Sequence, residues 1–231
     1  MCFPEVVDYL LVYHGRSRDS PDRDKPPAPS LLRPGRNRPS PCHRVFVYLL
    51  APRVIRAFMD AGLLYEDAQY HNCVFVCGRD GSGQPRFASK WGTCNLGGSS
   101  FKRDVLGSDK KIGFRLPCDP EIEEVAVFEA PIDLMSFCTL CPEVHSNAVA
   151  LCGLYSGSLD TYLRDHPHLK SIKLLLDNDG PGIAAAKEMR GRYREAGYEV
   201  EIRVPKYGKD WNAQLMYKLT GVLEEVKKPQ K

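Results

Sequence analysis

Apolar and polar positions follow two different periods along this 231-residue chain. Two apolar runs, CVFVCGRD and PRFASKWG, flank the glycine-rich turn Gly81-Ser82-Gly83, which predicts a β-hairpin. From residue 124 onward, four short apolar segments rich in β-branched residues alternate with four segments of helical periodicity. This alternation predicts an α/β fold with a parallel sheet and helices on its faces.

The pattern also sets approximate boundaries. It predicts strands over 125–129, 148–153, 172–177 and 198–204, and helices over 131–140, 158–166, 182–196 and 211–226. Upstream, apolar residues at helical spacing predict two further helices, over 44–50 and 52–63. The second has Pro52 at a favoured first-turn position. We therefore expect a smaller α+β subdomain over 43–120, followed by an α/β domain over 121–227.

The first forty residues have a different composition. Residues 3–12 have apolar positions at helical spacing and predict a short amphipathic helix, which we assign to a small unit over 1–15. Seven of the eighteen prolines fall between residues 16 and 41. Residues 16 to 44 also carry eight Lys/Arg and three Asp. Such a segment cannot bury a core, so 16–42 is predicted to be a disordered basic linker that attracts phosphate without specificity.

Bulk composition excludes few classes of function. The hydrophobic fraction of 43% and charged fraction of 26% are typical of a soluble globular protein, and a net charge of +3 only weakly favours an anionic partner. No run of 18 apolar residues is present, and the start of the chain lacks the features of a secretory signal. We therefore expect no membrane span and a cytoplasmic location.

Nine cysteines, an odd number, are predicted to be reduced thiols, several of them inside apolar runs. Cys138 and Cys141 form a CxxC pair, which leaves a zinc site as an alternative. Because no second pair lies at the spacing of a zinc finger, and the same spacing fits one face of a helix, we favour buried thiols.

Acidic residues follow two of the predicted strands. VAVF runs into Glu129, IKLLL runs into Asp177, and Asp179 lies two residues further on. Asp133 is one helical turn after Glu129 and can face the same crevice. Ligands of open parallel sheets bind beyond the carboxyl ends of the strands, so these four carboxylates are predicted to form one site. Lys209, Asp210 and Asn212 occupy the corresponding loop after the fourth strand.

Crowded carboxylates repel one another unless a cation is present, and oxygen ligands suit a hard cation such as Mg²⁺. Gly180 and Gly182 open the next helix, whose N-terminus favours an anion. Three alternatives stay open for the residues alone: helix caps or turns, a calcium loop, and a phosphate-accepting aspartate. The twelve-residue ladder of oxygens that a calcium loop requires is missing after Asp179, and a phosphate-accepting site would have a different acid spacing.

At this point the residues resemble a known family. VFEAPID is similar to the first Toprim motif, seen in bacterial DnaG-type primases as a glutamate after a strand with an aspartate four residues on. LDNDGPGIAAA resembles the second motif, and KDWNAQL resembles the later acidic segment. The resemblance covers about residues 122–226. It implies a Toprim fold, which is a Rossmann-like parallel sheet with flanking helices.

The upstream segment is similar to the uncharacterised domain that precedes Toprim in many proteins of bacterial conjugative and mobile elements. By this comparison Lys110 or Lys111 lies where primases place a lysine that contacts template or nucleotide. Relatives usually have Arg-Gly-Thr where this chain has Trp91-Gly92-Thr93. MCFPEVVDYLL resembles the last helix of the zinc-ribbon domain that opens such proteins, so we expect a remnant of that domain without its metal ligands.

The resemblance implies Mg²⁺-dependent (or Mn²⁺-dependent) phosphoryl or nucleotidyl chemistry. The implied metal ligands are Glu129, Asp133, Asp177, Asp179 and Asp210, with Glu129 also a candidate general base or acid. The implied phosphate contacts are Lys110, Lys111, Lys209 and Asn212. The leading hypothesis is a primase-like nucleotidyltransferase of a mobile element; the alternatives are a Toprim nuclease and a non-catalytic nucleic-acid-binding module. Candidate partners are single-stranded or duplex DNA, RNA, nucleotides, and a helicase or relaxase; the sequence does not predict the oligomeric state.

Overall fold

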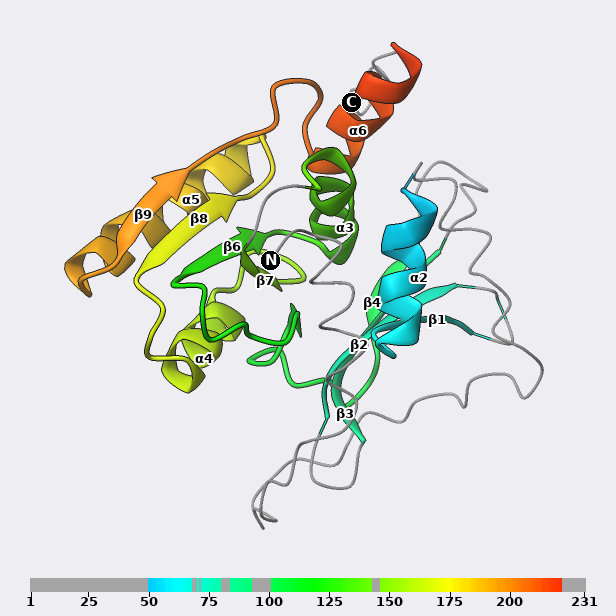
Figure 1. Cartoon of the computed structure of the whole chain (residues 1–231), viewed down its shortest axis with the longest axis horizontal. Helices are drawn as coiled ribbons and strands as arrows, with labels where there is room; N and C mark the ends of the chain where they lie inside the picture. Colours follow the sequence, from blue (N-terminus) through cyan, green and yellow to red (C-terminus); the bar gives the residue numbers. More distant parts are fainter. Residues whose placement is uncertain are drawn as a thin grey trace, which may run out of the picture.

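The chain contains two sheets, one antiparallel and one mainly parallel (Figure 1). The computed structural model describes residues 50–67, 70, 72–79, 84–92, 101–142 and 146–221. The predicted helix over 3–12, the linker over 16–42, the helix over 44–50 (apart from Leu50) and the end of the last helix beyond residue 221 lie outside these ranges. None of the described helices is long and apolar enough to cross a membrane.

The first sheet is antiparallel and has the order β1-β2-β3-β4. Its strands are β1 (Leu64–Glu66), β2 (Cys73–Arg79), β3 (Pro85–Trp91) and β4 (Lys102–Asp104). β2 and β3 pair antiparallel with Val76 opposite Ala88, which confirms the strand pairing of the predicted hairpin; its turn over 81–83 lies outside the described residues. Phe75 and Cys77 on β2 point into the main core, whereas Val74 and Val76 form a small cluster on the other face, as the two-residue period of a strand requires.

Helix α2 (Pro52–Asp60) packs on the core face of this sheet. Its proline is in the first turn, where a missing N–H costs nothing, and Gly62 follows the end with a φ of 67°. Val54, Ile55 and Phe58 are buried at helical spacing. The predicted helix over 52–63 is therefore confirmed, with an end three residues earlier.

The second sheet has the order β5-β7-β6-β8-β9. β6 (Glu124–Phe128), β7 (Asn147–Ala150), β8 (Ser171–Leu175) and β9 (Glu199–Ile202) are parallel neighbours, which confirms the predicted α/β architecture. The helices that alternate with them are α3 (Pro131–Leu140), α4 (Gly157–Asp165), α5 (Gly180–Glu195) and α6 (Trp211–Thr220). β5 (Phe114–Arg115) adds an antiparallel edge strand beside β7. Two residues carry no periodicity, so the pattern could not assign this strand to the sheet.

Helices cover both faces of the second sheet (Figure 1). α4 and α5 bury Leu159, Tyr162 and Met189 against one face. α3 and α6 cover the other face, where Phe137 packs edge-on against Trp211 with ring centroids 5.0 Å apart. The core beneath α3 and α6 is continuous with the core of the antiparallel sheet.

Phe114 is the centre of the joint between the two sheets. Its ring stacks on Phe58 of α2 at 6.0 Å and meets Phe75 of β2 edge-on at 5.5 Å, and it is fully buried. Thr139 near the end of α3 accepts a hydrogen bond from the backbone N–H of Ala51 at 3.2 Å. Aromatic packing and this hydrogen bond fix the antiparallel sheet against the α/β domain.

Candidate active site

Glu129 and Asp177 leave the same edge of the second sheet. β6 and β8 are adjacent and parallel, with Phe128 opposite Leu175. Glu129 directly follows β6, and Asp177 comes two residues after the end of β8. The carboxyl ends of parallel strands form the usual ligand-binding edge of such a sheet, so the fold brings both side chains to that edge.

Two helix starts add further polar groups to this edge. Asp133 is in the first turn of α3 and accepts a hydrogen bond from the backbone N–H of Asn212 at 3.3 Å. The Asn212 side chain donates to Ser136 Oγ at 3.0 Å. Asp210 is the N-cap of α6 and accepts from the N–H of Ala213 at 2.7 Å. These bonds hold the N-terminal ends of α3 and α6 together.

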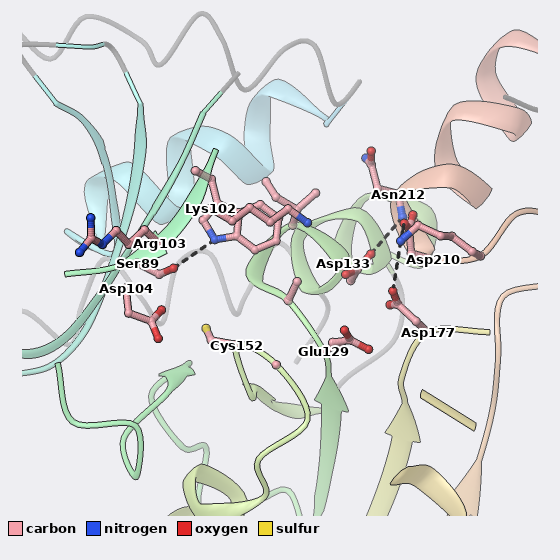
Figure 2. A pocket seen from close by; sticks show the side chains of 15 residues that line it. Ser89, Lys102, Arg103, Asp104, Glu129, Asp133, Cys152, Asp177, Asp210 and Asn212 are labelled. Carbon is pink, nitrogen blue, oxygen red and sulfur yellow. Dashed lines mark hydrogen bonds and ion pairs between the residues drawn. The ribbon is translucent and has the colours of Figure 1, made fainter. Parts of the chain in front are cut away.

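A cavity of about 380 Å³ lies between this edge and the antiparallel sheet (Figure 2). One wall carries the predicted site residues Glu129, Asp133, Asp177, Lys209, Asp210 and Asn212. The opposite wall comes from β3 and β4 and includes Ser89, Trp91, Lys102, Arg103 and Asp104. The cavity is therefore acidic on the α/β side and carries basic residues on the side of the antiparallel sheet.

Three predicted site residues do not line this cavity. Asp179 is the N-cap of α5, and its Oδ1 accepts from the N–H of Gly182 at 2.9 Å. Lys110 pairs with Asp104 Oδ2 at 3.2 Å, and Lys111 is exposed with its backbone N–H bonded to Asp109. Asp179 still acts on the site, because its charge helps to raise the pKa of Glu129.

Burial and mutual repulsion raise the pKa of three carboxyl groups here. Burial, then the charges of Asp177 and Asp179, raise the pKa of Glu129 to about 7. Burial and Asp210 raise that of Asp177 to about 6, and the same two causes hold the pKa of Asp133 well above its usual range. Without a cation this edge binds protons that ordinary carboxylates release.

Two lysines oppose this repulsion. Lys209 Nζ lies 3.7 Å from Asp177 Oδ2 and 3.5 Å from Asp210 Oδ2. Burial lowers the pKa of Lys209, but the charges of Asp210 and Asp177 outweigh burial and raise it. The charge of Lys102 in the opposite wall lowers the pKa of all three raised carboxyl groups, so both walls share one electrostatic field.

The donor set fits a hard divalent cation. Glu129 Oε2 and Asp177 Oδ1 are buried and have no hydrogen-bond partner among the described residues. Across the same described part of the chain, no three His, Cys, Asp or Glu side chains are already arranged around one ion position. Mg²⁺ does not require that arrangement, because it commonly takes one or two carboxylates and completes its shell with water and substrate phosphates.

Comparison with known proteins agrees with this geometry. Residues 126–215 match the family model described as Toprim-like. The second sheet and its helices are therefore similar to a Toprim-like domain, and we refer to this unit as the Toprim-like domain. Residues 49–119 match a family described as a protein of unknown function, DUF3991. Comparison with curated proteins finds no match.

Solved structures of primases share the fold. The primase fragment of the bacteriophage T7 primase-helicase protein aligns with a TM-score of 0.56 at 16% identity, covering 87% of this chain and 78% of that one. The Aquifex aeolicus primase (zinc-binding and RNA polymerase domains) aligns with a TM-score of 0.55 at 18% identity, covering 95% of this chain and 58% of that one. The DnaG primase catalytic domain bound to ssDNA aligns with a TM-score of 0.52 at 13% identity, covering 95% of this chain and 75% of that one. The chain thus spans little more than half of the Aquifex chain, and at these identities the likeness shows the fold.

The residues that sequence reasoning missed come from outside the Toprim-like domain. Lys102 pairs across the sheet with Trp91, and its ammonium lies 4.0 Å from the centroid of the indole ring. The indole N–H donates to Ser89 Oγ at 3.1 Å, which orients the ring. In Figure 2 Lys102 faces the carboxylates, whereas the side chain of Arg103 extends away from them. The run FKRD was the available sign, since the alternation of a strand places Lys102 and Asp104 on one face.

Cys152 is a second missed residue of the cavity wall. Its φ of 58° lies in the left-handed region, uncommon for a residue with a side chain. Burial raises the pKa of its thiol, so it remains protonated. None of the six described cysteines, which include Cys138 and Cys141, is in a disulfide bond, in agreement with the prediction of reduced cysteines.

Proposed function

We propose that this protein is a Mg²⁺-dependent enzyme that acts on nucleic acid, specifically a primase-like nucleotidyltransferase. The observation that carries the proposal is the cavity with a carboxylate wall from the Toprim-like domain and Lys102 in the facing wall. A nucleotidyl transfer needs both walls, because metal-binding acids act on the reacting phosphate while cations from the protein hold the remaining phosphates. The similarity of fold to primase catalytic domains supports this choice.

In this proposal the buried, unpaired oxygens of Glu129 and Asp177 are the first candidates to hold the metal. A bound Mg²⁺ or Mn²⁺ would stabilise the charge that develops on the transferring phosphate. Asp133 and Asp210 would bind it directly or through water. Asp179, which caps α5, would contribute negative charge close to Glu129.

The chain's own residues would supply the other functions. Lys209 and Lys102 would contact substrate phosphates, and the side-chain bond from Asn212 to Ser136 would keep α6 in register with α3. Glu129 is also the candidate general base or acid, because its pKa of about 7 in the metal-free protein is close to neutral pH, although a cation bound directly to it would lower that pKa. Lys110 and Lys111, outside the cavity, would contact the nucleic acid further from the reacting phosphate.

The wider assignment belongs to the same proposal. We propose single-stranded DNA and ribonucleotides as substrates, a cytoplasmic location, and a role in replication of a mobile element. The T7 relative is a fragment of a primase-helicase protein, which supports a helicase as a candidate partner. A relaxase is the other candidate.

Primer synthesis and nuclease assays on the full chain test the function together. Wild-type protein should join labelled ribonucleotides into primers on single-stranded DNA in Mg²⁺ or Mn²⁺ and should not cut the template. Asp177→Asn, which keeps the shape but removes the charge, should reduce primer yield by at least about a hundredfold, the scale of losing one transition-state charge partner. The matched control is Asp165→Asn, because Asp165 is exposed, lies outside the cavity lining and pairs with Arg115 and Arg164.

The other outcomes are equally specific. Template cleavage that Asp177→Asn abolishes would replace the primase proposal with a Toprim nuclease. If the wild-type protein neither extends nor cuts, and Mg²⁺ does not change its melting temperature, the protein is a non-catalytic binding module. Full activity of Asp177→Asn would refute the assignment of the site.

A further inference from the structure

A pair of tyrosines, one exposed and one partly buried, lies close to the acidic site, on the loop that carries Lys209 and on the helix that follows it. Tyr207 is on the β9–α6 loop and Tyr217 is on α6; their ring centroids are 4.3 Å apart and the rings are inclined by 32°. The side chain of Tyr207 is 36% exposed. Lys206 Nζ lies 5.3 Å from the centroid of the Tyr207 ring. Aromatic rings that are partly open to solvent beside a cation offer a surface on which a base can stack.

The loop that carries Tyr207 is fastened to the loop that carries the acids. The backbone N–H of Asn178 donates to the carbonyl of Lys209 at 2.6 Å, and its side-chain amide donates to the carbonyl of Pro205 at 3.3 Å. Asn178 stands between Asp177 and Asp179. On the other side, Gln214 Oε1 accepts from the backbone N–H groups of Lys206 and Tyr207. The tyrosine pair therefore has a fixed position relative to the candidate metal ligands.

The segment that carries the pair is rich in basic residues. Residues 203 to 218 contain four Lys/Arg and one Asp. Arg203, Lys206 and Lys218 are exposed, and the single acid, Asp210, lines the cavity instead. A cluster of cations with no other acid in that stretch attracts a polyanion.

Aromatic rings combined with lysines bind single-stranded nucleic acid in many folds, because bases stack on the rings while cations follow the phosphates. A duplex offers no free base faces for such stacking. We propose that Tyr207 and Tyr217, with Lys206 and Lys218, form a platform for single-stranded nucleic acid beside the acidic cavity. This inference rests on the proposed function and adds a strand-binding surface that the catalytic residues do not supply.

Fluorescence anisotropy with a labelled oligodeoxythymidine of about 20 nucleotides tests the platform on the full chain in EDTA. Tyr207→Ala should weaken binding about tenfold, since one stacked base contributes about 1–3 kcal/mol. Tyr207→Phe keeps the ring and should bind within about twofold of wild type. The matched control Tyr70→Ala removes a more exposed tyrosine, 65% accessible, from the antiparallel unit and should also leave affinity unchanged.

The salt dependence of oligonucleotide binding tests the contribution of Lys206 and Lys218. Lys206→Gln combined with Lys218→Gln should reduce the slope of log affinity against log salt by about 1.4, or 0.7 for each phosphate contact on a single strand. Ultraviolet cross-linking of a bromodeoxyuridine oligonucleotide should yield a cross-linked peptide that contains Tyr207. The Mg²⁺-induced rise in melting temperature should persist in Tyr207→Ala, which shows that the variant is folded with an intact acidic site.

The results separate the two proposals. If Tyr207→Ala binds the oligonucleotide as tightly as wild type, or if wild type does not bind it, the platform is refuted, whatever the primer assay shows. If Tyr207→Ala weakens binding while Asp177→Asn has no effect on any activity, the platform stands and the proposed catalytic function fails.

Discussion

The ammonium of Lys209 lies 3.7 Å from Asp177 Oδ2, inside a group of carboxylates that fits a divalent cation. It lies at a similar distance from Asp210. The lysine thus supplies an internal positive charge to acids that otherwise repel one another. An ammonium and Mg²⁺ favour the same position for the same electrostatic reason, so they should compete there.

Lys209→Met should therefore change the response to Mg²⁺ more than the stability itself. In EDTA the variant should lose about 0.5 kcal/mol of unfolding free energy, because the ion pairs are long and half exposed. Its melting temperature should then rise more than that of wild type when MgCl₂ is added, since the competing cation is gone. Differential scanning fluorimetry across a Mg²⁺ titration measures both effects.

Lys173→Met is the control for this substitution. Lys173 pairs with Glu124 on β6, near the opposite end of that strand from Glu129. The control should lose a similar amount of stability and keep the wild-type Mg²⁺ response. An equal response in Lys209→Met and wild type would show that lysine and metal do not share a position.

Stability without metal should fall as pH rises from about 4.5 to about 7. Glu129 titrates near pH 7 in the folded protein and at its ordinary pKa of 4.5 when unfolded. In this window the folded state binds more protons, so the stability present below pH 4.5 is lost as pH rises through the folded pKa. Denaturation in EDTA should give an unfolding free energy about 1–2 kcal/mol lower at pH 8 than at pH 4.5 from this group, after allowance for solvent screening.

Two comparisons isolate the contribution of Glu129. Glu129→Gln should reduce the slope between pH 4.5 and 7 without abolishing it, because Asp177, whose pKa is raised to about 6, and Asp133, whose pKa is raised well above its usual range, still bind extra protons in the folded state. Saturating Mg²⁺ should stabilise the wild-type protein most at high pH, where the carboxylates are ionised. A wild-type slope identical to that of Glu129→Gln would contradict the raised pKa of Glu129.

The acidic wall could be predicted because it depends on local pattern. A strand that ends in an acid, followed by a helix with an acid in its first turn, places Glu129 and Asp133 together without knowledge of any distant residue. Asp177 follows from the parallel alternation, which requires all strand ends to share one edge. Asp179 shows the limit of this reasoning, because an acid directly before a helix can be either a metal ligand or an N-cap. Here the Asp179 side chain caps α5.

The basic wall depends on how two units pack together. Lys102 reaches the cavity because Phe114 packs between Phe58 and Phe75 and fixes the antiparallel sheet against the Toprim-like domain. No period in the sequence encodes that orientation. The family resemblance pointed to Lys110 and Lys111, and the sequence did not single out Lys102.

Phe114→Ala should test this joint directly. Truncation of a fully buried phenylalanine leaves a cavity and should lower the unfolding free energy by about 3–5 kcal/mol. Because the core is continuous across both units, the variant should still unfold in one transition in guanidinium chloride. Phe101→Ala, at a ring that is 48% exposed, should cost much less. Two separate transitions in the wild-type protein would show that the units fold independently.

Lys102 and Lys110 make opposite predictions for nucleotide binding. Lys102 lies in the cavity wall and its charge acts on Glu129, whereas Lys110 does not line the cavity, is 63% exposed and pairs with Asp104. Lys102→Met should weaken binding of a nucleoside triphosphate in Mg²⁺ about tenfold, as expected for the loss of a charged hydrogen bond, and should leave Mg²⁺ affinity equal or higher. Lys110→Met should stay within about twofold of wild type in the same isothermal titration calorimetry. If Lys110→Met shows the larger loss, the nucleotide lies outside this cavity, and the acids and the phosphate contacts belong to different sites.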